Sequence, residues 1–402
     1  MLLPHPVFRS EELRRVRDAQ CLFASSAPPL IWTYNGRGAL FQVLLANRLA
    51  TARSIVLAPS FHCPTVVDPI LASGCAPEYY EVGADLDYDL DSLTARLGPR
   101  VSAVIAIQYF GWRRDLAPLR SQCERHGVLL IEDCCHSFLR DAPLRLAGGE
   151  GHVAVFSPWK LAPCVTAGVI KLNHVTWHPR PPRPLPFGDQ LDVLRTLASE
   201  WLSYSSVPAA MLGRAVLRRP LIQGLTQSPD ELLPKSPESD REGGAPPIVY
   251  PFIARTAESR AALASRWVLK RANLEWICAS RRRNYDQLFA QLRFNEAMQP
   301  LTGPLPSDVC PWALALRIPA RARIDFRLRR AGVPLFTFGE TLHESLSRGG
   351  TPPDLVQRAK LLADSSMCLP VHQQLSSTEI EWMADKVNAM LGSGSGWHRS
   401  SP

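Results

Sequence analysis

Two apolar stretches of this chain end in side chains that can do chemistry. The run 128–132 leads into Asp133, and the run 153–156 leads into Ser157, with Lys160 three positions later. An apolar run that ends in a polar residue is typical of a buried strand whose last side chain reaches the edge of a sheet. A carboxylate, a hydroxyl and an amine gathered there can hold a protonated ring nitrogen, bind a phosphate and form a Schiff base. These are three parts of one cofactor, pyridoxal 5'-phosphate (PLP), which the sequence therefore predicts.

A glycine-containing turn adds a second phosphate-binding element. Residues 35–39 read Asn-Gly-Arg-Gly-Ala, follow the short apolar run 31–33 and precede a helical pattern. Glycine lets backbone N–H groups approach an anion, and the N-terminus of a helix favours negative charge. We expect Gly36, Arg37 and Gly38 to anchor the phosphate together with Ser157. Taken alone, the same turn is also compatible with an ordinary tight turn.

Each remaining candidate has a chemical and a purely structural interpretation. His62, or its neighbour Phe61, can stack on a planar ring, and His136 can donate a hydrogen bond to the phenolic oxygen of the cofactor. The alternatives are a packed histidine for the first and a helix-surface histidine for the second. Asp133 alone can be a helix N-cap or a salt-bridge partner, and Lys160 can be a surface lysine. The apolar neighbours of Lys160 favour the chemical interpretation, because they disfavour a charged amine and make it more nucleophilic.

Composition narrows the class of protein. The chain has 402 residues, 46% hydrophobic and 20% charged, and a net charge of +8. Such a length predicts two domains and an ordinary globular protein. The densest basic clusters, at 281–283 and 327–330, are not interleaved with aromatic residues, so we expect acidic or phosphorylated small substrates and no nucleic acid.

Cysteine usage and hydropathy indicate the compartment. Ten cysteines are present without a Cys-x-x-Cys pair, which is typical of a reducing compartment and gives no ligand set for zinc. The N-terminal residues do not form a signal peptide, and no apolar run approaches the roughly 20 residues that span a membrane. We expect a cytoplasmic protein that does not bind membranes.

Hydrophobic periodicity predicts the elements that position these residues. Between about 30 and 172, apolar strands alternate with helices, which is the pattern of a mostly parallel, doubly wound α/β sheet. The expected strands are 54–57, 78–82, 101–109, 128–131, 153–156 and 168–172, and the expected helices 38–49, 66–73, 90–97 and 116–126. A helical stretch at 190–217 lies between Pro-rich segments, and a long helical region is expected at 257–292. Beyond it we expect a strand at 313–318 and helices at 321–331, 353–363 and 378–391.

Three units follow from this pattern. Residues 1–280 are expected to form a large PLP-binding domain, in which 173–250 is divergent and carries Pro-rich exposed loops. Residues 281–392 are expected to form a smaller C-terminal α+β domain, and 393–402 a flexible tail.

Five sequence motifs resemble the sugar aminotransferase family called DegT/DnrJ/EryC1/StrS, whose members are fold-type I PLP enzymes. Residues 35–40 resemble its Ser-Gly-Thr-x-Ala-Leu phosphate turn, 57–62 the loop that brings a stacking ring, and 108–111 its His-x-Tyr-Gly strand end. Residues 131–136 resemble its Glu-Asp-x-Ala-(Gln/His) segment, in which the Asp meets the pyridine nitrogen and the last residue the phenolic oxygen. Residues 369–380 resemble its C-terminal Leu-Pro-x-His segment.

The resemblance implies an aminotransferase that moves an amino group from an amino acid to a keto sugar, nucleotide-linked or related, in polysaccharide or secondary-metabolite biosynthesis. It also implies a homodimer with the site at the subunit interface. Lys160 would hold PLP and shuttle the proton, and Asp133 would keep the ring nitrogen charged. An arginine would bind the donor carboxylate; the candidates are Arg281, Arg283, Arg323 and Arg327.

The chain departs from the family pattern in two places. Fewer residues separate Ser157 from Lys160 than is common in the family, and the glycine-rich end is reduced to 166–168. The family's Gly-Tyr-Asn-x-Arg segment, through which a partner subunit closes the site, is not found. Two alternatives therefore stay open: a PLP enzyme for decarboxylation, elimination or condensation, and a catalytically degenerate regulatory or scaffold protein.

Overall fold

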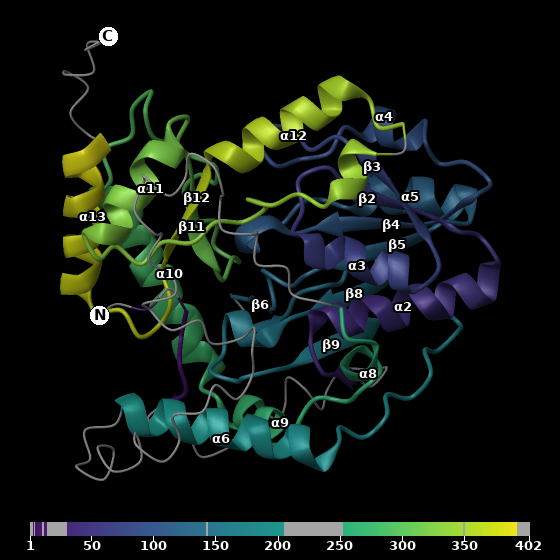
Figure 1. Cartoon of the computed structure of the whole chain (residues 1–402), viewed down its shortest axis with the longest axis horizontal. Coiled ribbons are helices and arrows are strands. Elements are labelled where there is room, and N and C mark those ends of the chain that lie inside the picture. Colours follow the sequence, from purple (N-terminus) through teal and green to yellow (C-terminus); the bar gives the residue numbers. More distant parts are fainter. Residues whose placement is uncertain are drawn as a thin grey trace, which may run out of the picture.

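A computed structural model gives the fold of residues 30–141, 144–204, 252–348 and 350–391, together with residue 3 and the short stretches 5–9 and 12–13. Within these ranges the centre is a seven-stranded sheet of order β1-β9-β8-β5-β4-β2-β3 (Figure 1). Its strands are β1 (Ile31–Thr33), β2 (Ile55–Pro59), β3 (Ala76–Tyr80), β4 (Val101–Ile107), β5 (Leu129–Asp133), β8 (Val153–Phe156) and β9 (Gly168–Leu172). Only β9 runs against its neighbours, so the sheet is mostly parallel.

The parallel core of this sheet is apolar on both faces. Every residue of β2, β4, β5 and β8 is buried, as expected where helices cover both sides of parallel strands. The connecting helices are α2 (Gly36–Thr51), α3 (Pro64–Ala72), α4 (Leu90–Thr94) and α5 (Ala117–His126). The carboxyl ends of the parallel strands consequently meet along one edge, where the candidate residues lie.

A smaller antiparallel sheet follows the long helix α10 (Leu274–Gln291). Its strands are β10 (Gln299–Pro300), β11 (Ala313–Arg317) and β12 (Ser366–Pro370), and its helices are α11 (Arg321–Arg330), α12 (Pro353–Ser365) and α13 (Ser377–Leu391). Figure 1 shows α10, α11 and α13 gathered around this sheet at one side of the large one. The α/β class with a smaller α+β part is the predicted one.

The remaining elements are short or peripheral. They are the two-stranded ribbon β6 (Leu139–Arg140) and β7 (Arg145–Leu146), the 3-10 turns η2 (Tyr109–Gly111), η3 (Pro158–Lys160) and η5 (Glu344–Ser347), and the helices α6 (Phe187–Tyr204), α8 (Ala254–Ala257) and α9 (Leu263–Arg271). Figure 1 shows α6 and α9 together below the large sheet.

One helical expectation was wrong. The region 257–292 is not one helix: it holds the last residue of α8 and the two helices α9 and α10, because the backbone leaves the helical conformation between α8 and α9 and again at Ala272. Asn273 then starts α10 by accepting a hydrogen bond from the Trp276 N–H, a regular N-cap. The expected domain boundary between 280 and 281 falls inside α10, and the division into domains stays a prediction. The expected exposed loops between 205 and 250, and the expected tail from 393, lie outside the described residues.

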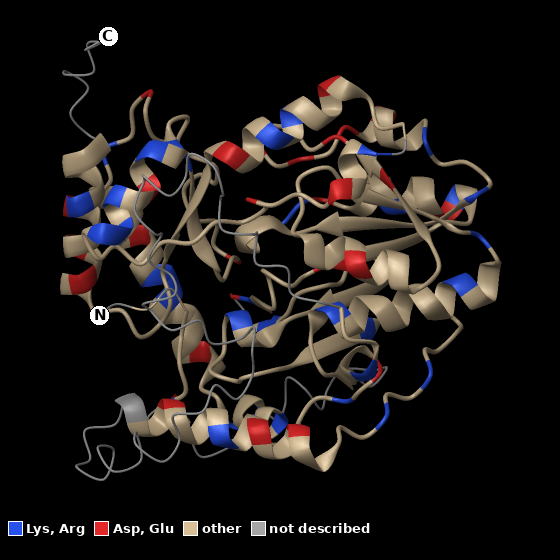
Figure 2. Cartoon of the chain, in the orientation of Figure 1, with Lys and Arg blue, Asp and Glu red and all other residues tan. Residues whose placement is uncertain are grey.

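Charges of both signs are spread over the helices (Figure 2). Many arginines are paired with a nearby carboxylate on the same or a neighbouring helix, for example Arg329 with Asp325 and Arg358 with Asp354. Among the described residues, no helix combines the length and the apolar character that crossing a membrane requires.

Candidate functional site

The ends of three strands bring the predicted chemistry together. Asp133 is the last residue of β5, Ser157 follows β8, and β5 and β8 are hydrogen-bonded neighbours. Lys160 closes the 3-10 turn that Ser157 begins, and its N–H donates to the Ser157 carbonyl at 3.2 Å. The turn into α2 lies beside them, because a Cβ atom on Gly36 would lie 3.2 Å from Ser157 Oγ.

The two adjacent carboxylates on β5 point to opposite faces of the sheet, because side chains alternate along a strand. Glu132 is fully buried on one face and accepts hydrogen bonds from the N–H groups of Glu150 and Gly151 and from the Gln108 side chain. It therefore fastens the loop before β8. Asp133 faces the candidate site and accepts from the N–H of Cys135 at 2.9 Å.

The environment of Asp133 suits a partner that carries positive charge. Burial raises the pKa of this carboxyl, and the hydrogen bonds from Cys135 and the charge of Lys160 act against that rise. A buried carboxylate is costly unless it meets a cation. A protonated ring nitrogen placed before it would supply that cation.

The N-terminus of α2 forms a cradle in which glycine is required at one position. A Cβ on Gly36 would lie 2.9 Å from Cys135 Sγ, closer than such contacts occur without a shift, and 3.1 Å from Ser157 Cβ, which is unusually tight. Gly36 thus lets the first turn of a 16-residue helix approach the end of β8. Helix N–H groups beside a serine hydroxyl suit a phosphate.

Gly38 and Arg37, the other two residues expected to bind the phosphate, make contacts within the protein. The N–H of Gly38 donates to Asn35 Oδ1 at 2.8 Å, and a Cβ there would lie 3.0 Å from the Ala257 carbonyl oxygen. Gly38 therefore allows α8 to pack on α2 and has no N–H left for an anion. The Arg37 guanidinium lies 3.7 Å from Asp68 on α3, so its side chain pairs with a carboxylate.

Lys160 extends over an aromatic ring. Its Nζ lies 4.6 Å from the centroid of the Trp312 indole, which directly precedes β11. A cation held over an indole face is attracted by the ring quadrupole. Lys160 as a whole is half-buried, so it is neither a fully solvated surface lysine nor sealed in the core.

His136 is buried beside the same indole. Its ring stacks on Trp312 at 4.0 Å between centroids, and its Nδ1 accepts from the Phe110 N–H at 3.3 Å. Burial, with a smaller contribution from the charge of Lys160, lowers the pKa of His136 well below its ordinary value. A neutral imidazole that accepts at Nδ1 carries its proton on Nε2, so His136 can donate a hydrogen bond there, as the phenolic oxygen of PLP would need.

The two predicted stacking residues point elsewhere. His62 is fully buried, stacks on Tyr79, donates from Nδ1 to the Pro59 carbonyl and accepts at Nε2 from the His343 N–H. Burial lowers its pKa to about 4. Phe61 is also fully buried and packs between Tyr109 and Phe338. Both residues follow β2 and are packed in the protein interior.

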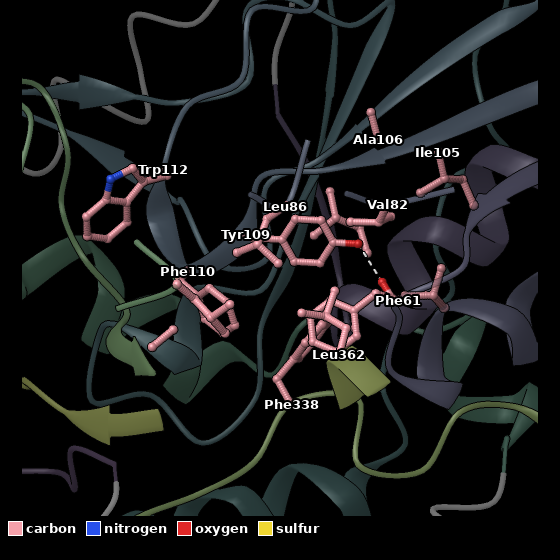
Figure 3. Packing of buried hydrophobic residues seen from close by; sticks show 14 of the residues in the cluster. Phe61, Val82, Leu86, Ile105, Ala106, Tyr109, Phe110, Trp112, Phe338 and Leu362 are labelled. Atoms are coloured by element: carbon pink, nitrogen blue, oxygen red, sulfur yellow. Dashed lines mark hydrogen bonds between the residues drawn. The ribbon is translucent and has the colours of Figure 1, made fainter. Parts of the chain in front are cut away.

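An aromatic cluster connects that support to the site. Figure 3 shows Phe61, Tyr109, Phe110 and Phe338 together, with the Tyr109 hydroxyl donating to the Phe61 carbonyl. Phe338 lies edge-on to His136 and Trp312. Phe110 has a φ of 57°, a costly value for a bulky residue, and its backbone bonds explain why it persists: its N–H donates to His136 and its carbonyl accepts from Trp312.

The candidate arginines for binding a donor carboxylate differ in their exposure to solvent. Arg283, Arg323 and Arg327 are exposed on helices, whereas Arg281 is 1% exposed and each of its N–H groups donates within the protein. Arg281 is therefore not available to bind a substrate carboxylate.

Sequence reasoning missed Trp312 and misjudged Arg281. The motif Cys-Pro-Trp at 310–312 stands just before an expected strand, and an aromatic residue at a strand start is too common to single out. The three arginines at 281–283 suggest a single basic cluster on the surface. Only Arg282 and Arg283 are half-exposed or exposed, whereas Arg281 is buried.

Taken together, these residues fit PLP. The chain offers a helix N-terminus beside a serine, a buried carboxylate, a neutral histidine with a donor at Nε2, and a half-buried amine over an indole. Each matches the chemistry of one part of the cofactor.

Comparison with known proteins shows similarity to aminotransferases. Residues 25–173 match the DegT/DnrJ/EryC1/StrS aminotransferase family. The chain is 29% identical over 124 residues to the GDP-perosamine synthase of Vibrio cholerae, an alignment that covers 31% of this chain and 34% of that protein. It is 33% identical over 129 residues to the dTDP-3-amino-3,4,6-trideoxy-alpha-D-glucose transaminase of Micromonospora megalomicea subsp. nigra, covering 31% and 33%. The alignments thus span about a third of these relatives.

The fold is shared over nearly the whole chain. The solved structure of Helicobacter pylori PseC, an aminotransferase involved in the biosynthesis of pseudoaminic acid, superposes with a TM-score of 0.62 over 96% of this chain and 94% of that one, at 14% identity. The chain therefore shares the α/β fold of that aminotransferase. Residues 25–173, which hold every predicted cofactor-binding residue, are the part of the chain that is similar to the DegT/DnrJ/EryC1/StrS aminotransferase family.

Proposed function

We propose that this protein is a PLP-dependent aminotransferase that transfers an amino group from an amino acid to a keto sugar. The observation that carries the proposal is the meeting of Asp133 and Lys160 at the ends of two neighbouring segments, with Gly36 and Ser157 beside them. When bound, PLP supplies an electron-accepting ring that stabilises negative charge on the substrate α-carbon.

The residues of the chain have separate tasks in this proposal. The N–H groups at the start of α2 and the Ser157 hydroxyl bind phosphate. Asp133 holds a proton on the ring nitrogen, and His136 donates from Nε2 to the phenolic oxygen. The Nζ of Lys160 would hold the cofactor covalently, and as a free amine it would serve as the base that accepts and returns the proton during amino transfer.

The proposed acceptor follows from the relatives. The printed names of two relatives refer to a GDP-linked and a dTDP-linked amino sugar, and a net charge of +8 suits an acidic nucleotide-linked substrate. We therefore propose a nucleotide-linked keto sugar as the acceptor. The homodimeric assembly and the cytoplasmic location remain predictions from the sequence.

Covalent capture tests the cofactor. Protein loaded with PLP is reduced with borohydride and digested, and the pyridoxyl group is located by mass spectrometry. We expect the adduct on Lys160 in wild type, and its loss from that peptide in Lys160→Ala. An adduct spread evenly over the exposed lysines would refute the proposal.

Amino-acid half-reactions test the activity. With L-glutamate the visible absorption band should convert to that of the amino form of the cofactor, and an added nucleotide-linked keto sugar should restore it with a mass change for amination. Release of CO₂ or of a β-substituent in place of this conversion would favour decarboxylation or elimination. An adduct at Lys160 without any half-reaction would favour a degenerate regulatory protein.

A further inference from the structure

Arg281 is the most highly connected buried cation among the described residues. Its side chain is 1% exposed, and its five N–H groups match five acceptors at 3.1–3.3 Å. Nε donates to the Gln373 side chain. One terminal nitrogen donates to the carbonyls of Pro311 and Trp312, and the other to those of Lys160 and Leu161. A guanidinium has five donors, so its capacity is used in full.

The four carbonyls belong to two segments that are remote in the sequence. One carries the amine of the proposed chemistry, and the other carries the indole over which that amine lies. The planar fork of arginine can reach two peptides on each side of itself, whereas the single ammonium of lysine cannot. Arg281 therefore joins the backbone of Lys160 to the backbone of Trp312.

Each segment is also held by local backbone hydrogen bonds of its own. Lys160 and Leu161 donate back into the 3-10 turn, to the Ser157 and Pro158 carbonyls, and Trp312 donates to the Phe110 carbonyl. The described hydrogen bonds include no direct bond between the two segments. Besides the contact of the Lys160 amine with the Trp312 indole, the guanidinium is thus the hydrogen-bonded link between the two backbones.

A polar chain keeps the charge of Arg281 in place. Gln373 accepts from Arg281 and donates from its Nε2 to Glu12, which is itself 4% exposed. Burial lowers the pKa of Arg281 to about 10, and the charge of Glu12 acts against that. A buried charge is costly and apolar residues often replace such groups without loss of stability, so stability alone gives weak grounds for an arginine here.

We propose that Arg281 is a positioning residue: it fixes the peptide of Lys160 against the peptide of Trp312 and so holds the Lys160 amine at the indole face. This inference deepens the proposed function, on which its catalytic meaning rests. Arg281 itself touches neither cofactor nor substrate in this assignment.

Three variants test it. Arg281→Lys keeps the charge but not the planar fork. Gln373→Leu removes the acceptor at Nε together with the hydrogen bond to Glu12, and it serves where Arg281→Lys does not fold. Arg282→Lys is the matched control, because the Arg282 side chain also donates to carbonyls, those of Pro306 and Val309, and pairs with Asp141, without reaching residues 160–161. A thermal melt first establishes which variants are folded at the assay temperature.

The first measurement needs no cofactor. Hydrogen exchange followed by mass spectrometry should show faster exchange in Arg281→Lys for two segments together, 157–162 and 309–313. Arg282→Lys should affect at most the second. If Arg281→Lys speeds exchange in neither segment, or in only one, the proposed coupling is refuted.

The second measurement counts adducts. The chain has six lysines, of which Lys270, Lys360 and Lys386 are exposed and serve as internal standards. After PLP addition and borohydride reduction, the adduct at Lys160 relative to these three should fall about 10- to 100-fold in Arg281→Lys, the cost of a misplacement of about 1 Å. A variant that melts earlier but retains the wild-type ratio would show a merely structural role and overturn the inference.

The two proposals fail separately. If wild type gives no preferred adduct at Lys160, the proposed function fails, and the exchange experiment alone then decides whether Arg281 couples the two segments. If wild type captures PLP at Lys160 and Arg281→Lys does so equally well, the proposed function stands and the positioning role falls.

Discussion

The imidazole of His136 stacks on the indole of Trp312, with 4.0 Å between ring centroids and 28° between ring planes. Trp312 enters from the start of β11, in the smaller sheet, while His136 follows β5 of the large one. Because Lys160 Nζ lies 4.6 Å from the same indole, one aromatic side chain from the C-terminal part of the chain contacts two candidate residues from the N-terminal part. The environment of the amine therefore depends on how the two sheets are held together.

Trp312 should accordingly matter for cofactor capture as well as for stability. We expect Trp312→Phe, which keeps a stacking face, to retain more of the Lys160 adduct than Trp312→Leu. Trp312→Ala should also lower the free energy of unfolding, by up to about 3 kcal/mol for a side chain that is only half-buried. Adduct mapping and urea unfolding of the same samples measure both effects. Equal capture by the Phe and Leu variants would contradict a role for the aromatic face.

Glu132 and Asp133 provide a matched pair of carboxylates. Asp133→Asn should still give the Lys160 adduct but reduce amino transfer about 100-fold or more, because a preorganised charge at the reacting group is lost. Glu132→Gln should instead reduce the free energy of unfolding by about 1–3 kcal/mol, since the Glu150 and Gly151 N–H groups would face an amide that satisfies them poorly. Single-turnover rates and urea unfolding separate the two. If Glu132→Gln lowered the rate of amino transfer per folded molecule, the assignment of Glu132 to stability and Asp133 to catalysis would be refuted.

Gly36 and Gly38 should respond differently to the same substitution. In Gly36→Ala the new Cβ would press on Cys135 Sγ and Ser157. Overpacking costs about 1–3 kcal/mol, and about 1.4 kcal/mol is tenfold in affinity, so PLP binding should weaken about tenfold or more. Cys135→Ala added to Gly36→Ala should restore part of it.

In Gly38→Ala the clash falls on the Ala257 backbone. The cost should therefore appear as lower thermal stability with nearly unchanged PLP affinity in the folded protein. Equilibrium titration of PLP and thermal melts check both variants. A larger affinity loss for Gly38→Ala than for Gly36→Ala would contradict the assignment of the cradle.

Sequence patterns were sufficient for the part of the site that strand ends create. Asp133 and Ser157 could be placed together because buried parallel strands end at a common edge, and alternation along β5 assigns Glu132 and Asp133 to opposite faces. The break of the region 257–292 was not predicted, since nothing in its periodicity marks Ala272 as the end of a helix.

Contacts between remote segments were outside the reach of those patterns. Whether His62 faces a ligand or Tyr79 depends on which ring packs against it, and that is a tertiary property. The same holds for Arg281, whose acceptors come from three separate segments. Local sequence identifies such residues as polar and leaves open whether they are solvated, buried or functional.

Two buried histidines should make the protein sensitive to acid. Burial lowers the pKa of His62 to about 4 and that of His372 to about 3, from an ordinary 6.5. In unfolded chains both rings bind protons as the pH falls below 6.5, while the folded protein keeps them neutral. The unfolded state therefore holds more protons in this window, and stability, complete above pH 6.5, is lost as the pH falls toward 4, at up to about 1.4 kcal/mol per pH unit for each ring. Urea unfolding between pH 5 and 7.5 measures this slope. His62→Asn keeps a donor near the Pro59 carbonyl, and His372→Gln keeps one near the Leu3 carbonyl, so each should reduce the slope without abolishing folding at pH 7.5. A wild-type slope in both variants would show that other groups cause the acid sensitivity.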